Sequence, residues 1–127
     1  MLKVDKAFSG FSVNDLAAAA DFYTKTLGVA VEEIPQGLRL KIGNGILVYP
    51  KSDHVPATYT VLNLPVDNID QALDELIGKG IKFEHYAGIT DHKGVARGLA
   101  HNMGPDIAWF KDPAGNILSI LQLPLSP

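Results

Sequence analysis

The chain contains two related copies of one sequence pattern, and this repeat limits the folds that it can adopt. The segment FSVNDLAAAADFYTKTLGVAVEE, residues 11–33, is similar to LPVDNIDQALDELIGKGIKFEH, residues 64–85. Apolar positions of the two segments coincide at an offset of 53, and Gly28 becomes equivalent to Gly80 after one residue is lost. We therefore expect two similar structural modules.

Both copies predict a strand followed directly by an amphipathic helix. The first strands are KAFSGFSV, residues 6–13, and TYTVLNLPV, residues 58–66. An Asn or Asp that favours a helix N-cap follows each strand: Asn14 or Asp15, and Asp67 or Asn68. Apolar residues then recur at helical spacing: Leu16, Ala20, Tyr23 and Leu27 in the first copy, and Ile69, Leu73 and Leu76 in the second. Gly28 ends the first helix, and Gly78 and Gly80 end the second.

Three strand candidates follow each predicted helix. They are residues 29–34, 38–42 and 45–50 in the first copy, and residues 81–86, 107–112 and 116–121 in the second. The predicted fold class is α+β, with the order βαβββ occurring twice. We expect a single domain, residues 1–127, made of module 1 (1–50) and module 2 (57–124), which the polar linker 51–56 joins.

The second copy carries about nineteen extra residues, because the offset between the copies grows from 52 to 71. They lie in AGITDHKGVARGLAHNMG, residues 87–104, which has four glycines and no clean periodicity. A loop of this length in a compact domain is typical of a lid, a binding loop or a mobile segment. Asp91 and Arg97 in this loop are expected to be solvated, and the alternative is that they hold an anionic ligand.

The last two strand candidates are joined by Asp112-Pro-Ala-Gly-Asn116, which predicts a hairpin turn. Asp at the first position accepts hydrogen bonds from the following backbone, so Asp112 is expected to be structural rather than catalytic. One hydroxyl, Ser119, interrupts the apolar run that follows the turn. Its presence there needs an explanation.

Composition excludes several kinds of partner and site. A net charge of −3 argues against nucleic acid and against an anionic membrane surface as partners. The absence of cysteine excludes disulfides and thiolate metal sites. Neither an N-terminal signal pattern nor an apolar run of about 20 residues occurs, so we expect a cytoplasmic protein that does not span a membrane. The four histidines lack the close spacing typical of metal ligands and are expected to be surface residues.

The motifs VNDLAAAADFYTKTLG, residues 13–28, and WFKDPAGNILSILQ, residues 109–122, resemble the vicinal oxygen chelate superfamily. This superfamily includes glyoxalase I, extradiol dioxygenases, fosfomycin resistance enzymes and bleomycin-binding proteins. The resemblance covers essentially the whole chain. It implies two modules whose curved mixed sheets pack side by side and enclose a cavity, and it implies a homodimer, as in many relatives.

The resemblance also implies where a metal ion would bind. Metal-using relatives place His or Gln on the first strand and Glu on the last strand of each module. The equivalent positions here are Phe8 and Val61 on the first strands, and Val48 and Ser119 on the last strands. None of these side chains is a strong donor for a divalent cation, and a shift of one position recovers no ligand set. We therefore expect no standard metal site and no cofactor.

The cavity is expected to be mostly apolar with a few polar groups, a composition typical of small-molecule sites. Residues with the same strand parity as Phe8 and Val61 would face it. The predicted ligand-binding residues are Phe8, Gly10, Ser12, Val48, Val61, Asn63, Trp109 and Ser119. Two alternatives stay open: Gly10 permits close packing of strands, and Asn63 satisfies backbone groups.

The leading hypothesis is a metal-independent protein that binds a small, partly apolar organic molecule in the cavity between the modules. Residues 87–104 would cover the ligand, and the protein would sequester it, as drug-binding relatives do. The first alternative is a lyase, isomerase or dioxygenase that uses a non-standard metal site or an acid–base residue such as Tyr59 or His101. The second is a structural or regulatory dimer whose own side chains fill the cavity.

Overall fold

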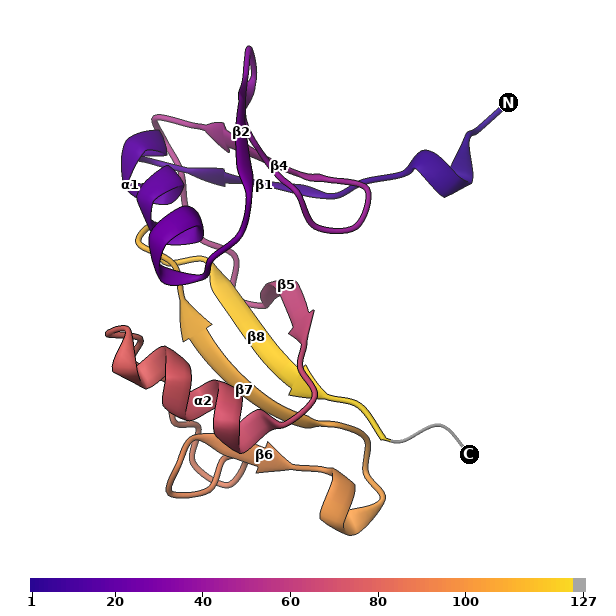
Figure 1. The fold of residues 1–127 in the computed structure, drawn as a ribbon, viewed down its shortest axis with the longest axis vertical. Coiled ribbons are helices and arrows are strands. Elements are labelled where there is room, and N and C mark those ends of the chain that lie inside the picture. Colours follow the sequence, from indigo (N-terminus) through magenta and orange to yellow (C-terminus); the bar gives the residue numbers. More distant parts are fainter. Residues whose placement is uncertain (125–127) are drawn as a thin grey trace. The chain divides into compact units, whose positions relative to one another are not determined.

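The computed structural model describes residues 1–124 and divides the chain into two compact units, Met1–Pro56 and Ala57 onward. Each unit holds a mixed four-stranded sheet with a helix on one face (Figure 1). The order of elements in each unit is strand, helix and three strands, so the predicted α+β fold with two βαβββ modules is confirmed. No helix within residues 1–124 is long and apolar enough to cross a membrane.

The first unit forms a sheet with the strand order β1-β4-β3-β2. Strands β1 and β4 are parallel, and the other neighbours are antiparallel. The elements are the 3-10 turn Val4–Lys6, β1 (Gly10–Val13), α1 (Leu16–Asp21), a π-helical continuation (Phe22–Thr26), β2 (Val31–Ile34), β3 (Gly37–Leu40) and β4 (Ile46–Pro50).

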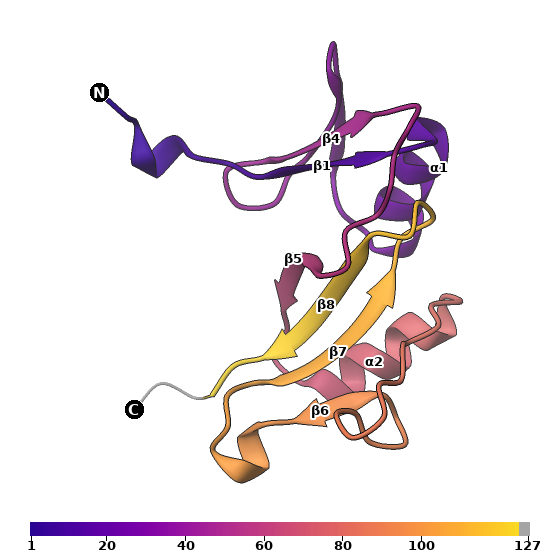
Figure 2. The ribbon, with the colours of Figure 1, turned by 180° about the vertical axis from the view of Figure 1, so that it is seen from behind.

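The second unit repeats this topology with the order β5-β8-β7-β6. Helix α2 packs against β7 and β8, as Figure 2 shows from behind. The elements are β5 (Thr60–Pro65), α2 (Ile69–Gly78), β6 (Val95–Arg97), the 3-10 turn Leu99–His101, β7 (Asp106–Lys111) and β8 (Ile117–Gln122).

Side-chain caps fix where both helices begin. The Asp15 carboxylate accepts a hydrogen bond from the Ala18 amide at 3.0 Å, and the Asn68 side-chain oxygen accepts one from the Gln71 amide at 3.0 Å. Of each pair of cap candidates in the sequence, the second therefore caps the helix. Gly28, with φ +69°, follows the end of the first helix, as predicted.

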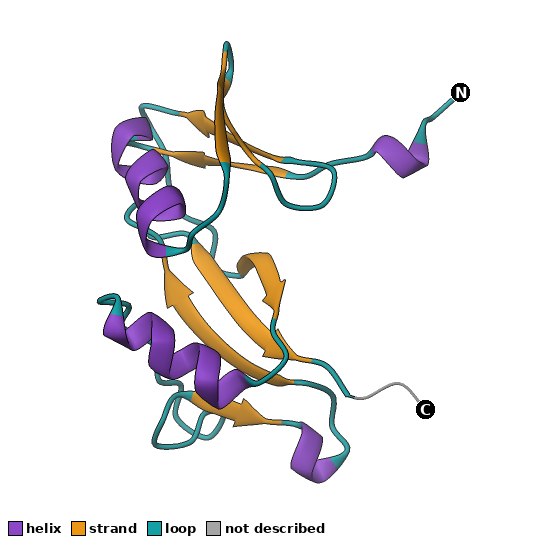
Figure 3. Cartoon of the chain, viewed as in Figure 1, coloured by secondary structure: helices purple, strands orange, loops and turns teal. Residues whose placement is uncertain are grey.

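The prediction of a strand over residues 81–86 is wrong. This segment appears as loop in Figure 3, and β6, from the extra residues 87–104, pairs with β7 instead. One hydrogen bond, from the Glu84 amide to the Trp109 carbonyl at 2.8 Å, still holds the segment beside β7. The apolar pattern reflects burial of Ile81 and Phe83 rather than a ladder of backbone hydrogen bonds.

Each sheet has one face against its helix and one face away from it, which we call the open face. In the first sheet, Phe11 and Val13 are buried on the helix side, where the Phe11 ring lies 6.2 Å from the Tyr23 ring. Alternation along β1 therefore puts Gly10 and Ser12 on the open face. The partner register extends that face to Leu47 on β4.

Candidate functional site

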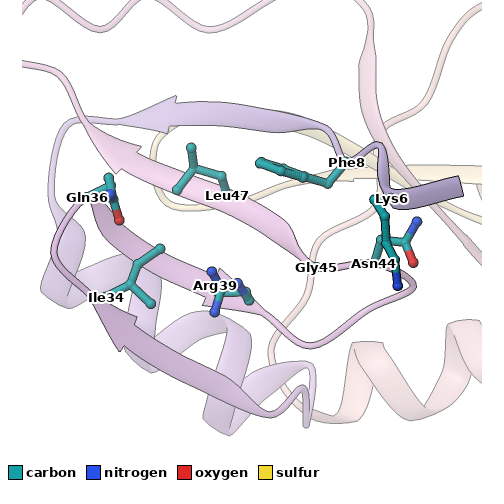
Figure 4. A pocket seen from close by; sticks show the side chains of 8 residues that line it. All are labelled: Lys6, Phe8, Ile34, Gln36, Arg39, Asn44, Gly45 and Leu47. Carbon is teal, nitrogen blue, oxygen red and sulfur yellow. The ribbon is translucent and has the colours of Figure 1, made fainter. Parts of the chain in front are cut away.

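The open face of the first sheet carries a pocket of about 460 Å³. Figure 4 shows its side chains, which come from three strands, from the segment before β1, from the turn between β2 and β3 and from the turn before β4. The apolar side chains are Phe8, Ile34 and Leu47, and the polar ones are Lys6, Gln36, Arg39 and Asn44, with Gly45 completing the lining. This volume and this mixture are typical of small-molecule sites.

Asn44 fixes the segment that supplies Phe8. Its side-chain amide donates hydrogen bonds to the carbonyl of Asp5 at 2.9 Å and to that of Ala7 at 3.0 Å. The amide of Leu47 donates to the Ser9 carbonyl at 3.1 Å. These bonds hold the segment beside β4, and they keep the Phe8 side chain at the pocket although 64% of its surface is exposed.

Two cations line this pocket. The Arg39 guanidinium forms an ion pair with Glu32 on the neighbouring strand, and both side chains are about half exposed. Lys6 makes no side-chain hydrogen bond or ion pair within residues 1–124. The pocket therefore has one cation that is neutralised and one that is not.

Two predicted ligand residues on β1 have structural partners. A Cβ on Gly10 would lie 2.9 Å from the Leu47 carbonyl oxygen, which supports the interpretation that Gly10 permits close packing of β1 on β4. The Ser12 hydroxyl lies 2.6 Å from Nδ1 of His54. Sequence reasoning missed His54. Its position after the end of β4, the parallel neighbour of β1, is the signal that could have found it.

Val48 does not lie on the open face, contrary to its assignment as a ligand-binding residue. It pairs with Phe11 and is fully buried on the helix side. Leu47 and Tyr49, which pair with Gly10 and Ser12, occupy the open face of β4 instead. The assignment fails by one position because strand parity alone does not give the register between β1 and β4.

The structure explains the hydroxyl in the apolar run of β8. Ser119 is fully buried and pairs with Asn63 on the parallel neighbour β5. The Ser119 hydroxyl donates a hydrogen bond to the Asn63 side-chain oxygen at 2.7 Å. Asn63 is thus satisfied by a side chain rather than by backbone, which differs from the alternative drawn from the sequence. The Asn63 side chain makes no further hydrogen bond within the part of the chain that the structure describes.

Trp109 belongs to the second sheet. It pairs with Ser119 across β7 and β8, so the two side chains lie on the same face of that sheet. Its indole N–H donates to the Thr60 hydroxyl at 3.1 Å, and its ring packs edge-on against Tyr86 with centroids 5.5 Å apart. A smaller hollow of about 260 Å³ adjoins these rings and is lined by Thr58, Tyr59, Thr60, Tyr86, Ile89, Trp109 and Ile117. Val61 is half-buried at the register shift of β5 and does not line this hollow.

The two acid–base candidates lie at different pockets. Tyr59 is 70% exposed beside the Trp109 hollow. His101 is exposed in the extra segment, at a separate pocket of about 620 Å³ that also involves Arg97 and Met103. Within residues 1–124 neither side chain is hydrogen-bonded to another ionisable group, so the structure does not join them into a catalytic pair.

Ion pairs fasten the extra segment to α2. Arg97 donates two hydrogen bonds to the Asp70 carboxylate, at 2.8 and 3.0 Å, and one to Asp91 at 2.9 Å. Lys93 donates to Asp70 at 2.7 Å. Arg97 and Asp91 are therefore engaged with protein groups and not simply solvated, and this part of the segment is anchored to α2.

These contacts shift the pKa values of both carboxyl groups. Hydrogen bonds from Arg97, and then from Lys93, hold the pKa of Asp70 well below its usual range despite partial burial. Burial raises the pKa of Asp91, but the Val95 amide and Arg97 together outweigh burial and lower the pKa to about 2. Both groups therefore favour the folded segment in their ionised form.

We expect this anchor to weaken in acid. A lowered pKa contributes stability that is present above the unfolded value of about 4 and is lost as pH falls through the folded value. Arg97→Gln should thus lower the free energy of unfolding by about 1 kcal/mol near neutral pH, and the difference from wild type should shrink between about pH 4 and pH 2. Urea unfolding across this range measures it, with Lys41→Gln as the charge-matched control. A difference that stays constant down to pH 2 would contradict the assignment.

The residues at the implied metal positions do not fit a divalent cation. Val48 faces the helix, the Ser119 hydroxyl is bonded to Asn63, and the Phe8 ring offers no donor. Over residues 1–124, no three His, Asp or Glu side chains are grouped so that they could hold a metal ion. That the protein works without a metal stays a prediction.

Comparisons with known proteins agree with this architecture. The family model described as Glyoxalase/Bleomycin resistance protein/Dioxygenase superfamily matches residues 7–120. A glyoxalase family protein from Bacillus anthracis has a similar structure, with a TM-score of 0.70, 24% identity, and coverage of 92% of this chain and 93% of that chain. No match was found among curated proteins.

Two further solved structures share the fold. One is TnmS3, an antibiotic binding protein from Streptomyces sp. CB03234, with a TM-score of 0.64, 21% identity, and coverage of 92% of this chain and 93% of that chain. The other is a member of the same superfamily from Sphaerobacter thermophilus, with a TM-score of 0.64, 21% identity, and coverage of 91% and 94%. At such identities the likeness concerns the fold alone.

Proposed function

Because the chain belongs to the Glyoxalase/Bleomycin resistance protein/Dioxygenase superfamily, we propose that it binds a small, partly apolar organic molecule on the open face of its first sheet. The observation that carries this proposal is the position of Phe8. Phe8 is 64% exposed as a residue, and it lines a pocket of about 460 Å³ together with Leu47 and Ile34. Covering such a ring with a ligand removes apolar surface from water, which is the main driving force for binding.

Sequestration fits this pocket better than catalysis. Its polar side chains are two cations and two amides, which bind and orient ligands but do not form a nucleophile and base. TnmS3, which has the same fold, is an antibiotic binding protein, and this supports a binding role for this chain. Neither Tyr59 nor His101, the acid–base candidates from the sequence, lines the pocket.

A fluorescent apolar probe, N-phenyl-1-naphthylamine, tests the proposal directly. We expect saturable binding, and we expect Phe8→Ser to raise the dissociation constant about tenfold, because burying an aromatic ring contributes roughly 1.5 kcal/mol or more. Val55→Ser is the matched control, since Val55 is 82% exposed in the same unit and does not line the pocket. Absence of saturable binding, or equal affinities for the two variants, would overturn the proposal.

A further inference from the structure

We propose that the first-sheet pocket selects organic anions: molecules with an apolar body and a carboxylate or sulfonate group, which Lys6 and Arg39 hold. This inference rests on the proposed function and names the ligand class. The apolar body would lie against Phe8, Leu47 and Ile34. Figure 4 shows Lys6 and Asn44 at one end of the pocket, with Arg39 and Ile34 on the neighbouring strands.

The charge of the lining is opposite to the charge of the chain. The protein carries a net charge of −3, yet the pocket is lined by two cations and by no acidic residue. Glu32, the acidic group nearest in the hydrogen-bond network, pairs with Arg39. Lys6 has no acidic partner within residues 1–124, so its charge is left for a ligand. Arg39 contacts Glu32 through Nη1, so its other guanidinium nitrogens can donate to the same anionic group.

The backbone that carries Lys6 is fixed rather than loose. The Asn44 side chain donates hydrogen bonds to the carbonyl groups of Asp5 and Ala7, the two neighbours of Lys6 in the chain. Residues Val4–Lys6 also form a 3-10 turn. The Lys6 amine therefore reaches the pocket from an anchored point, although its stem is flexible. Placing a cation at a defined distance from an apolar surface is what selects an amphipathic anion over a neutral molecule of the same shape.

Two probes that differ by one anionic group separate this inference from the proposed function. The anionic probe is 8-anilinonaphthalene-1-sulfonate, and the neutral one is N-phenyl-1-naphthylamine, which has the same ring system without the sulfonate. We expect Lys6→Gln and Arg39→Gln each to raise the dissociation constant of the sulfonate probe about fivefold, as for a partly exposed ion pair. The dissociation constant of the neutral probe should change by less than about twofold.

Three controls sharpen the comparison. Lys3→Gln makes the same charge change three residues away and outside the pocket, so it should leave both probes unaffected. Glu32→Gln should lower the dissociation constant of the sulfonate probe, because it frees Arg39 from its ion pair. Raising the salt concentration from about 0.05 to 0.5 M should weaken only the sulfonate probe, through screening.

Each outcome decides between the two proposals. If both probes bind and the Lys6 and Arg39 variants weaken them equally or not at all, the anion inference is overturned and the proposed function stands. If neither probe binds, both are overturned. If only the sulfonate probe binds, the proposed function is overturned, because apolar burial does not suffice for binding, and the anion inference that rests on it is overturned as well.

Discussion

Gly37→Ala is expected to lower the free energy of unfolding by about 3 kcal/mol or more, through strain and a displaced strand. Gly37 begins β3 with φ +145°, a conformation that side chains rarely adopt. A Cβ there would lie 2.3 Å from the Val48 carbonyl oxygen and 3.1 Å from the Tyr49 Cα. Both atoms belong to the β4 backbone, so the strand must move as a unit.

The damage would extend into the core of the first unit. Leu38, the next residue, pairs with Val48, and both are buried against the helix side of the sheet. Moving β4 would also displace Leu47, which lines the pocket. Circular dichroism during urea unfolding measures the effect. Gly43→Ala is the control: φ is +55° there but the space is open, so the loss should be only about 1 kcal/mol. Equal losses of unfolding free energy in the two variants would contradict the predicted clash with β4.

Asp112→Ala is expected to lower the free energy of unfolding by about 3 kcal/mol, because it removes several hydrogen bonds from a buried turn. Asp112 is 4% exposed. It accepts bonds from the amides of Ala114 and Asn116, each at 2.9 Å, and from the Asn116 side chain at 3.0 Å. Asn116 is itself 2% exposed, so the two hydrogen bonds that it donates to Asp112 would be lost without replacement by water.

Thermal unfolding of Asp112→Ala beside Asp67→Ala checks this expectation. Asp67 is exposed and accepts no side-chain hydrogen bond within residues 1–124, so its loss should change stability by less than about 0.5 kcal/mol. Asp112→Asn should fall between the two, since it keeps one acceptor oxygen and loses the charge. If Asp112→Ala lowered stability no more than Asp67→Ala, the structural role assigned to Asp112 would be wrong.

The repeat was the most informative part of the sequence for the fold. Two copies of one pattern predicted two βαβββ units, because amphipathic periodicity and cap residues are local signals that tertiary structure seldom overrides. The structural assignment of Asp112 was likewise local and correct, since its partners lie within four residues. The edge strand was not local. Residues 95–97, rather than 81–86, form the edge strand of the second sheet. Ion pairs between Arg97 and Asp70, which is far away in the sequence on α2, hold them there.

The candidate site was less predictable because it depends on register and on distant contacts. Parity along β1 predicted the face on which Ser12 lies, but the face of Val48 depends on the pairing of β4 with β1, which no local pattern in the sequence indicates. The bond between Ser12 and His54 joins residues 42 positions apart. The two cations of the pocket, Lys6 and Arg39, come from the segment before β1 and from β3, and no motif links them.

The most direct test is an isotope-edited NMR experiment on the full chain with N-phenyl-1-naphthylamine. If the open face of the first sheet is the binding site, intermolecular nuclear Overhauser effects will connect the probe to the Phe8 ring and to the methyl groups of Ile34 and Leu47. Effects confined to Trp109 and Ile89 in the second unit, or no effects at saturating probe, would contradict it.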